Sequence, residues 1–173
     1  MLLSMLTTNQ KGAIAEPAIT KVALEIGWDV YRPAREGRRY DLILEMENGL
    51  ARIQCKWAPL QRDALVVRSY STPRTRSGLL RKVYADGEFD YLAAYSPDLD
   101  RCYLLPWAVI AGASQLHLPV SPARNNQRQG IREAKAFEFA ATLAQISLGP
   151  IAQLGERRHG MAEVAGSIPA GST

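Results

Sequence analysis

Three polar side chains stand at spacings that allow them to act together on one bond. Asp41 begins one short apolar run, and Gln54 and Lys56 alternate with apolar residues in the next. A hard cation such as Mg²⁺ prefers oxygen ligands; once bound, it lowers the pKa of its water and stabilises charge developing on phosphorus. A lysine beside it can orient or deprotonate the attacking water. The pattern therefore indicates a candidate site for metal-assisted phosphodiester hydrolysis.

The elements that must position these residues are two strands and a tight turn. Asn48-Gly49 separates two β-rich runs, Tyr40–Met46 and Leu50–Trp57, which is a strong hairpin signal. A turn centred on this dipeptide places Asp41 directly opposite Lys56. Side chains alternate along strands, so one face is polar and the other apolar. The polar face is Asp41, Ile43, Glu45, Arg52, Gln54 and Lys56, and the core face is Leu42, Leu44, Ile53, Cys55 and Trp57. The alternative is an ordinary solvated hairpin face with weak cross-strand ion pairs.

A second carboxylate is desirable, because a glutamine offers a ligand oxygen but no charge. Glu16 is our candidate, on a predicted helix whose apolar residues recur at helical spacing and which ends at Gly27. These apolar residues are Ala15, Ala18, Ile19, Val22, Ala23 and Ile26. Pro17 is unfavourable deep inside a helix, so we expect either a late start near Ala13–Glu16 or a kink.

Basic side chains concentrate on the same part of the chain. The whole sequence has a net charge of +4, whereas residues 31–82 carry twelve Lys and Arg against five Asp and Glu, a net of +7. This distribution predicts a nucleic-acid partner. The candidate DNA contacts are Arg35, Arg38, Arg39, Arg74, Arg76, Arg81 and Lys82, with surface solubilisation as the alternative. Asn125, Asn126 and Gln127 could read adenine edges or phosphates, or cap the following helix.

The motifs around these residues resemble the PD-(D/E)XK nuclease superfamily. They are Arg39-Tyr40-Asp41-Leu42 and Arg52-Ile53-Gln54-Cys55-Lys56, preceded by Lys11-Gly12 and Glu16. They are most similar to the branch that includes group I intron-encoded homing endonucleases, in which glutamine replaces the usual acidic residue. Tyr40 stands where the superfamily motif has proline.

The resemblance covers residues 10–127 and implies an α/β fold with a mixed central β-sheet flanked by helices. It implies cleavage of double-stranded DNA with Mg²⁺, for which Mn²⁺ is expected to substitute. Carried over by position, the catalytic residues are Glu16, Asp41, Gln54 and Lys56, and the first three are metal ligands or their supports.

The rest of the chain is predicted to complete one domain, residues 1–148. Further elements are strands at Trp28–Arg32 and Asp63–Ser71, a basic loop at Thr72–Gly78, a hairpin of Phe89–Tyr95 with Arg101–Leu105, and helices at Trp107–Ala111 and Arg132–Ile146. Two cysteines make no disulfide framework or zinc site, and no apolar run is long enough for a membrane span. We therefore expect a cytoplasmic protein. Because double-strand cleavage needs two active sites or two passes, we expect a homo-oligomer, a dimer or a tetramer.

The last residues, 149–173, form a predicted tail outside the fold. They are rich in Gly, Ala and Arg and lack Phe, Trp and Tyr. Gly166-Ser167-Ile168-Pro169 can be encoded by GGT TCG ATT CCC, which contains a tRNA TΨC-loop consensus. One hypothesis is read-through into an adjacent tRNA gene, and the other is an ordinary disordered terminus.

Three functions are compatible with these residues. The first is a site-specific endonuclease similar to intron-homing enzymes. The second is a structure-selective nuclease similar to Holliday-junction resolvases, which normally carry Glu-x-Lys where Gln54-x-Lys56 stands. The third is a catalytically inactive DNA-binding module on the same fold, in which Gln54 is the substitution that abolished catalysis.

Overall fold

The computed structural model describes residues 5–35, 37–47, 49–72, 74–76, 78–121, 132–139 and 141–142. The predicted tail at 149–173 and the candidate DNA contacts Asn125, Asn126 and Gln127 lie outside these residues. Within the described part of the chain, no helix is both long and apolar enough to cross a membrane.

Helix α1 (Thr8–Glu25) starts earlier than Pro17 suggests. Thr7 is its N-cap: Thr7 Oγ1 accepts a hydrogen bond from Gln10 N at 3.3 Å, and Gln10 Oε1 accepts one from Thr7 N at 2.8 Å. This capping box satisfies two N–H groups at the helix start and fixes its first turn. The expected late start near Ala13–Glu16 is therefore wrong. Pro17 lies inside the helix on its exposed side, so its ring displaces no buried side chain.

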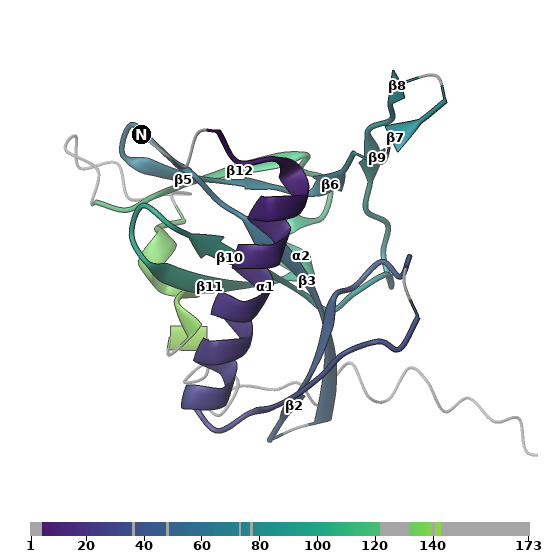
Figure 1. Ribbon diagram of the computed structural model, residues 1–173. Helices are drawn as coiled ribbons and strands as arrows, with labels where there is room; N and C mark the ends of the chain where they lie inside the picture. The colour runs from purple at the N-terminus through teal and green to yellow at the C-terminus, as the bar shows by residue number, and fades with distance from the viewer. Residues whose placement is uncertain are drawn as a thin grey trace, which may run out of the picture.

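A five-stranded mixed sheet lies beside α1 (Figure 1). Gly27, whose positive φ of 86° suits glycine, turns the chain from the helix into β1 (Asp29–Tyr31). The strand order is β1-β2-β3-β10-β11, where the other strands span Leu42–Met46, Gly49–Trp57, Tyr91–Ser96 and Arg101–Pro106. β10 runs parallel to β3, and the other neighbouring pairs of this sheet are antiparallel. The predicted mixed central sheet and the predicted second hairpin are both confirmed.

The β2–β3 hairpin differs in register from our prediction. Met46 pairs with Gly49, so the turn is centred one residue earlier than Asn48-Gly49. Gly49 is already the first residue of β3, where its φ of 123° is accessible to glycine. The pairing ends at Leu42 and Ile53, and Asp41 N donates a hydrogen bond to Ile53 O, so the predicted position of Asp41 opposite Lys56 is wrong. The pairing shifts by two residues, so the side chains of the paired residues keep their predicted faces.

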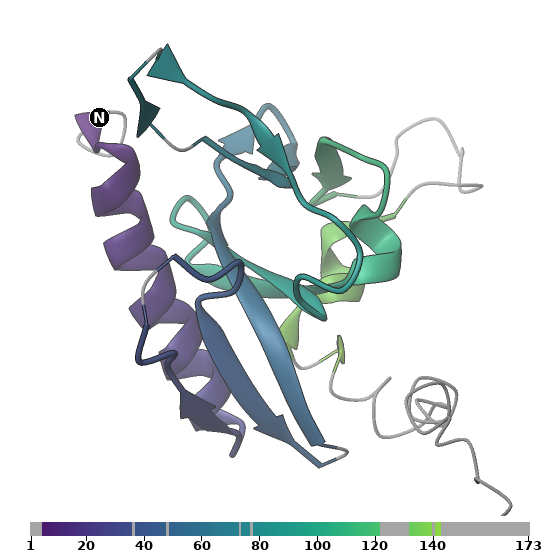
Figure 2. The same cartoon turned by 90° about the vertical axis from the view of Figure 1, so that its right-hand side faces the viewer.

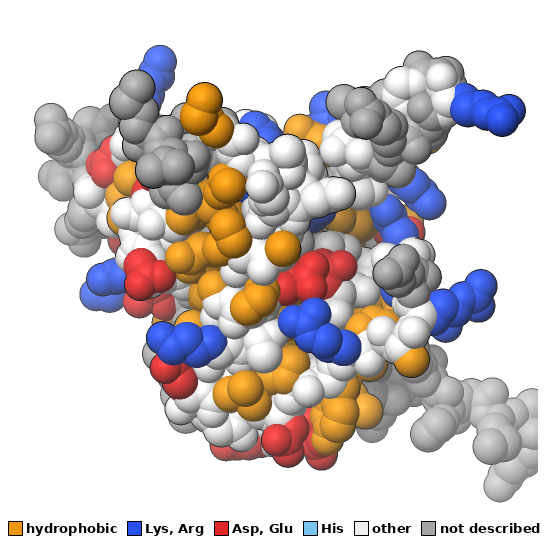
Figure 3. All heavy atoms as spheres, viewed as in Figure 1, with side chains coloured by type: hydrophobic (Ala, Val, Ile, Leu, Met, Phe, Trp, Pro, Cys, Tyr) orange, Lys and Arg blue, Asp and Glu red, His pale blue; other side chains and the backbone are white. Residues whose placement is uncertain are grey.

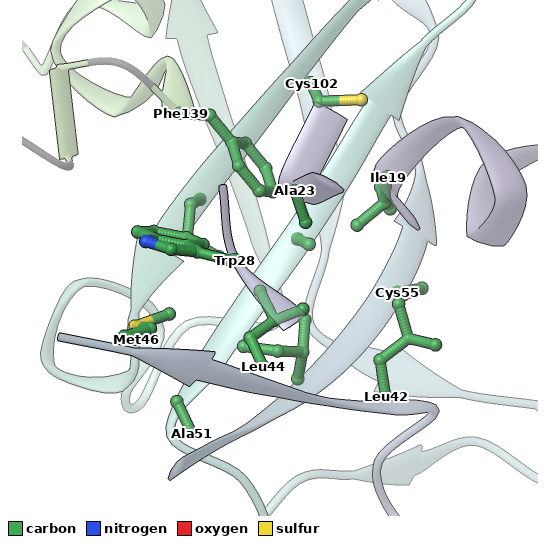
Figure 4. Close-up of a cluster of buried hydrophobic side chains, with 13 residues drawn as sticks. Ile19, Ala23, Trp28, Leu42, Leu44, Met46, Ala51, Cys55, Cys102 and Phe139 are labelled. Atoms are coloured by element: carbon green, nitrogen blue, oxygen red, sulfur yellow. The ribbon is translucent and has the colours of Figure 1, made fainter. Parts of the chain in front are cut away.

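Two hydrophobic clusters cover opposite faces of the sheet. The first fills the space between α1 and the sheet and contains the predicted core face of the hairpin except half-buried Trp57 (Figure 4). Its members are Ile19, Ala23, Trp28, Leu42, Leu44, Met46, Ala51, Ile53, Cys55, Ala93, Cys102, Leu104 and Phe139. The second packs on the other face and contains Ala58, Leu65, Val67, Tyr84, Phe89, Leu92, Ala94, Tyr103, Leu105, Ile110, Leu118 and Ala134.

Smaller elements cover the face of the central sheet that carries the second cluster. A second sheet has the order β12-β5-β4, spanning Gln115–Pro119, Ala64–Arg68 and Leu60–Gln61. The helices there are α2 (Trp107–Ile110), as predicted, and a 3-10 turn, η2 (Ala134–Phe137). Figure 2 shows α1 on one side of the central sheet and α2 with η2 on the other. A continuous helix at Arg132–Ile146 is wrong for the described residues, because Glu138 instead forms a β-bridge with Tyr103; residues 143–146 lie outside them.

A two-stranded arm, residues 70–83, extends from the body of the protein (Figures 1 and 2). At its root β6 (Tyr70–Ser71) pairs with β9 (Lys82–Val83), and further out β7 (Arg74–Thr75) pairs with β8 (Gly78–Leu79). Within the expected loop at Thr72–Gly78, the described residues Arg74, Thr75 and Gly78 are instead in strands β7 and β8. The predicted strand Asp63–Ser71 is divided accordingly, with its first part in β5 and its last two residues in the arm.

Candidate active site

The centre of the candidate site is the carboxylate of Asp41, directly before β2. Asp41 N donates a hydrogen bond to Ile53 O at 2.8 Å, which holds this residue against β3. Asp41 Oδ2 accepts hydrogen bonds from Cys55 N at 2.7 Å and from Gln54 Nε2. Gln54 Nε2 also donates to Cys55 O at 3.2 Å. Two acceptor oxygens, Asp41 Oδ2 and Cys55 O, thus converge on one electropositive nitrogen.

The second predicted carboxylate lies close to this centre. Burial raises the pKa of the Asp41 carboxyl; the hydrogen bond from Cys55 N opposes the rise, and the negative charge of Glu16 adds to it. Glu16 is on α1, and its Oε2 accepts a hydrogen bond from Arg32 Nη1 at 2.9 Å. The structure therefore brings Glu16 into the electrostatic environment of Asp41, while Arg32 partly neutralises it.

Lys56 occupies the same face of β3, two residues beyond Gln54. Burial lowers the pKa of its ammonium to about 8, the Asp41 carboxylate opposes this shift, and the charge of Arg39 adds to it. Its Nζ lies 5.0 Å from the centre of the Tyr84 ring. Both forms of the lysine are accessible near neutral pH, so the group can serve as a charge or exchange a proton.

The oxygen atoms at this centre fit a hard divalent cation. Among the described residues, His, Cys, Asp and Glu alone form no metal-binding group of three or more. The donors here are of another kind: Asp41 Oδ2 and Cys55 O already point at a shared partner, and Gln54 carries an amide oxygen. A nitrogen with partial positive charge now occupies the point on which they converge, and a cation satisfies the same two oxygens.

The predicted DNA contacts fall into two groups. Arg35 and Arg38 are exposed on the loop after β1, and Arg76, Arg81 and Lys82 are exposed on the arm. Arg74 lies on β7 of the same arm. Figure 3 shows Lys and Arg side chains along the arm, at the upper right. The arm contains no Asp or Glu, so its charge is uniformly positive.

Arg39 differs from the other arginines because its guanidinium is already engaged within the protein. Nε donates to Glu88 Oε1 at 2.8 Å, Nη1 to Ser71 Oγ at 2.9 Å and Nη2 to Val83 O at 3.2 Å. Its side chain is 22 % exposed. These contacts favour an anchoring role for Arg39 over a free phosphate contact.

Comparison with known proteins gives the family of the chain. A family model described as PD-(D/E)XK endonuclease matches residues 6–140. The chain belongs to the PD-(D/E)XK endonuclease family. A solved structure of a bacterial homing endonuclease, I-Ssp6803I, is similar, with a TM-score of 0.62 and 28 % sequence identity, over 88 % of this chain and 98 % of that one. No curated protein matches the sequence.

In this PD-(D/E)XK endonuclease, the candidate site is supported by residues that sequence reasoning did not assign to it. Arg52, on the face of Gln54, donates from Nε and Nη2 to the carboxylate of Asp90 at 3.1 and 2.9 Å and from Nη1 to Gly87 O at 2.7 Å. Asp90 also accepts from Arg52 N at 2.8 Å, so the pair fixes β3 to the segment before β10. The Tyr84 ring lies next to the Lys56 ammonium. The partners in each contact are at least 28 residues apart, so no local pattern could have revealed them.

Proposed function

We propose that this endonuclease hydrolyses phosphodiester bonds of double-stranded DNA with the help of a divalent cation, Mg²⁺, for which Mn²⁺ substitutes. The observation that carries the proposal is the convergence of Asp41 Oδ2 and Cys55 O on one point beside a half-buried lysine. Asp41 and Lys56 are both half-buried, which is unlike a solvated hairpin face, because burial disfavours both charges.

The residues divide into two roles. Asp41 Oδ2 and Cys55 O would hold the cation together with Glu16 and, once its amide oxygen replaces Nε2, Gln54; the cation would lower the pKa of its bound water and stabilise the charge of the transition state. Lys56 supplies the positive charge that offsets charge growing on the phosphoryl oxygens, and it orients the attacking water. Arg32 competes for Glu16 at 2.9 Å, so cation binding by Glu16 requires that this ion pair weaken.

The exposed cations support DNA as the substrate. The arm presents only positive charge and is a two-stranded ribbon, a shape that the major groove of B-DNA admits. Arg35 and Arg38, exposed on the loop that leads to Asp41, add further positive charge. Phosphate contacts of this kind position the duplex without reading its sequence.

Site-specific cleavage resembling intron homing is the finer part of the proposal. It is supported by the likeness to I-Ssp6803I, which is described as a homing endonuclease. An assembly of two or more copies, each cutting one strand, is consistent with double-strand cleavage.

Cleavage assays with three substrates test the proposal. The test duplex spans the DNA site into which the gene for this protein is inserted, without the insertion. We expect Mg²⁺ and Mn²⁺ to support double-strand cleavage of this duplex, and EDTA to abolish it. Supercoiled plasmid without that site and a synthetic four-way junction serve as controls. Preferential cleavage of the junction would show a resolvase-like enzyme instead, and absence of metal-dependent cleavage on all three substrates would refute the catalytic proposal.

Gln54→Glu is expected to retain cleavage and to bind the cation more tightly. A carboxylate beside Asp41 adds a charged ligand, but without metal it replaces the donor Nε2 with a repelling oxygen. The variant should therefore have a lower Tm than the wild type in EDTA and a larger rise in Tm on adding Mg²⁺. Thermal melting with a Mg²⁺ titration measures both.

Gln54→Leu is the matched control, because it removes the amide at similar size. It should show little Mg²⁺-dependent stabilisation and weak cleavage. Equal responses to Mg²⁺ in the Glu and Leu variants would exclude Gln54 from the cation site.

A further inference from the structure

Tyr84 lies directly after the arm and makes contact with two cations at once. The Arg39 guanidinium carbon is 4.4 Å from the centre of its ring, and Lys56 Nζ is 5.0 Å from it. The residue is 7 % exposed, so the ring is fixed by its surroundings. Phe89 packs edge-on against it at 4.9 Å, and Trp107 packs edge-on against Phe89 at 5.4 Å. The ring thus has one orientation, supported from the core.

Arg39 connects this ring to the root of the arm. It donates to Ser71 Oγ on β6 and to Val83 O on β9, the two strands that pair there. Ser71 Oγ in turn donates to Lys82 O at 3.4 Å. Glu88 holds the third side of the guanidinium. Arg39 therefore joins both strands of the arm root to the Tyr84 ring.

Among the described residues, few other groups lie near the Lys56 ammonium. The charged and titratable groups near its ammonium are Asp41 and Arg39 from the loop before β2, Cys55 from its own strand and Tyr84 from the segment after β9. A lysine ammonium is a point charge on a flexible stem, and an aromatic face within about 6 Å attracts it. Geometry thus gives the ring the means to hold the ammonium in place.

We propose that Tyr84 is a positioning residue: its ring holds the Lys56 ammonium beside Asp41, and Arg39 fixes that ring to the root of the arm. The proposal rests on the proposed function, in which Lys56 acts at the scissile phosphate. It assigns Arg39 to placement of the catalytic lysine and not to phosphate binding.

The contact itself can be tested without cleavage. In protein labelled with ¹³C-lysine, the ε-methylene signal of Lys56, assigned with Lys56→Met, should show an upfield ring-current shift. Tyr84→Phe keeps the ring and should keep the shift. Tyr84→Leu should lose the shift. Tyr103→Leu makes the same truncation at another buried tyrosine of the second hydrophobic cluster, and it should keep the shift. Absence of the shift in the wild type would overturn the proposal.

The catalytic consequence is tested by single-turnover cleavage with the same variants. At saturating DNA, Tyr84→Leu should be about tenfold slower than the wild type, from loss of the cation–π contact. Tyr84→Phe should restore the rate, and Tyr103→Leu should lower Tm without slowing the reaction. Equal cleavage rates of Tyr84→Leu and Tyr103→Leu would show that Tyr84 contributes only to packing, and would overturn the proposal.

Arg39→Met separates positioning from DNA binding. We expect a slower reaction at saturating DNA, and no further slowing when the change is added to Tyr84→Leu, because the two residues act in series. A raised KM with an unchanged saturating rate would instead make Arg39 a phosphate contact and overturn its assignment. A wild-type protein that shows the ring-current shift but cuts no DNA would overturn the proposed function and leave the Lys56–Tyr84 contact supported.

Discussion

Asp41→Asn is expected to lower the rate of DNA cleavage by on the order of a thousandfold while leaving the fold intact. Asparagine has the same shape and retains an oxygen that can accept the hydrogen bond from Cys55 N. It lacks the negative charge that binds the cation, so both metal affinity and transition-state stabilisation are lost. Single-turnover cleavage at saturating DNA and Mg²⁺ measures the effect.

The same substitution should change stability in a direction that depends on the metal. The raised pKa of Asp41 means that the folded state disfavours the carboxylate relative to the unfolded chain, so at neutral pH its charge opposes folding. The neutral asparagine removes this cost, and the variant should melt at the same temperature as the wild type or higher in EDTA. The rise in Tm that Mg²⁺ gives to the wild type should be absent.

Glu45→Gln is the matched control for Asp41→Asn. Glu45 is on β2, on the same face and four residues further along, but it is exposed and its Oε2 accepts a hydrogen bond from Tyr31 OH at 2.5 Å. Removing this charge should leave both cleavage and the response to Mg²⁺ unchanged. Normal cleavage by Asp41→Asn would show that the active site lies elsewhere.

The placement of Asp41 and Gln54 illustrates how far the sequence determines the site. Alternation along two strands was sufficient to put both side chains on one face, because the apolar residues between them must be buried. The register was wrong because Asn48-Gly49 has two compatible positions in a tight turn, and Gly49 also tolerates the positive φ at a strand start. A two-residue shift of the register preserves the face of each paired side chain. The predicted grouping of side chains therefore remained correct, although the residue opposite Asp41 was wrong.

Other parts of the site depend on contacts that no local pattern encodes. Arg39 and Arg38 are neighbours in the sequence with the same charge, yet only Arg39 is enclosed by Glu88, Ser71 and Val83. The charge cluster predicted a basic surface correctly but could not separate a structural arginine from a free one. Pro17 misled in the opposite way, because the penalty of an internal proline was outweighed by the capping box at Thr7 and by packing of the helix on the sheet.

Lys56→Met is expected to slow cleavage by about a hundredfold to ten-thousandfold, the range for loss of a general acid–base group. Methionine keeps the unbranched apolar stem and removes the charge. Because burial lowers the pKa of Lys56 to about 8, the folded state disfavours its ammonium, and this charge opposes folding below that pH. The variant should therefore melt at or above the wild-type temperature at pH 7, which excludes misfolding as the cause of lost activity.

The response to Mg²⁺ distinguishes this variant from Asp41→Asn. Lys56 is not among the proposed ligands, and removing a cation near the site relieves repulsion of the metal. Mg²⁺ should therefore still raise the Tm of Lys56→Met, at least as much as in the wild type, and DNA affinity measured in Ca²⁺ should change little because the arm cations are intact. Loss of the Mg²⁺ response together with activity would place Lys56 in the metal-binding structure itself. Loss of activity alone assigns it to the chemical step.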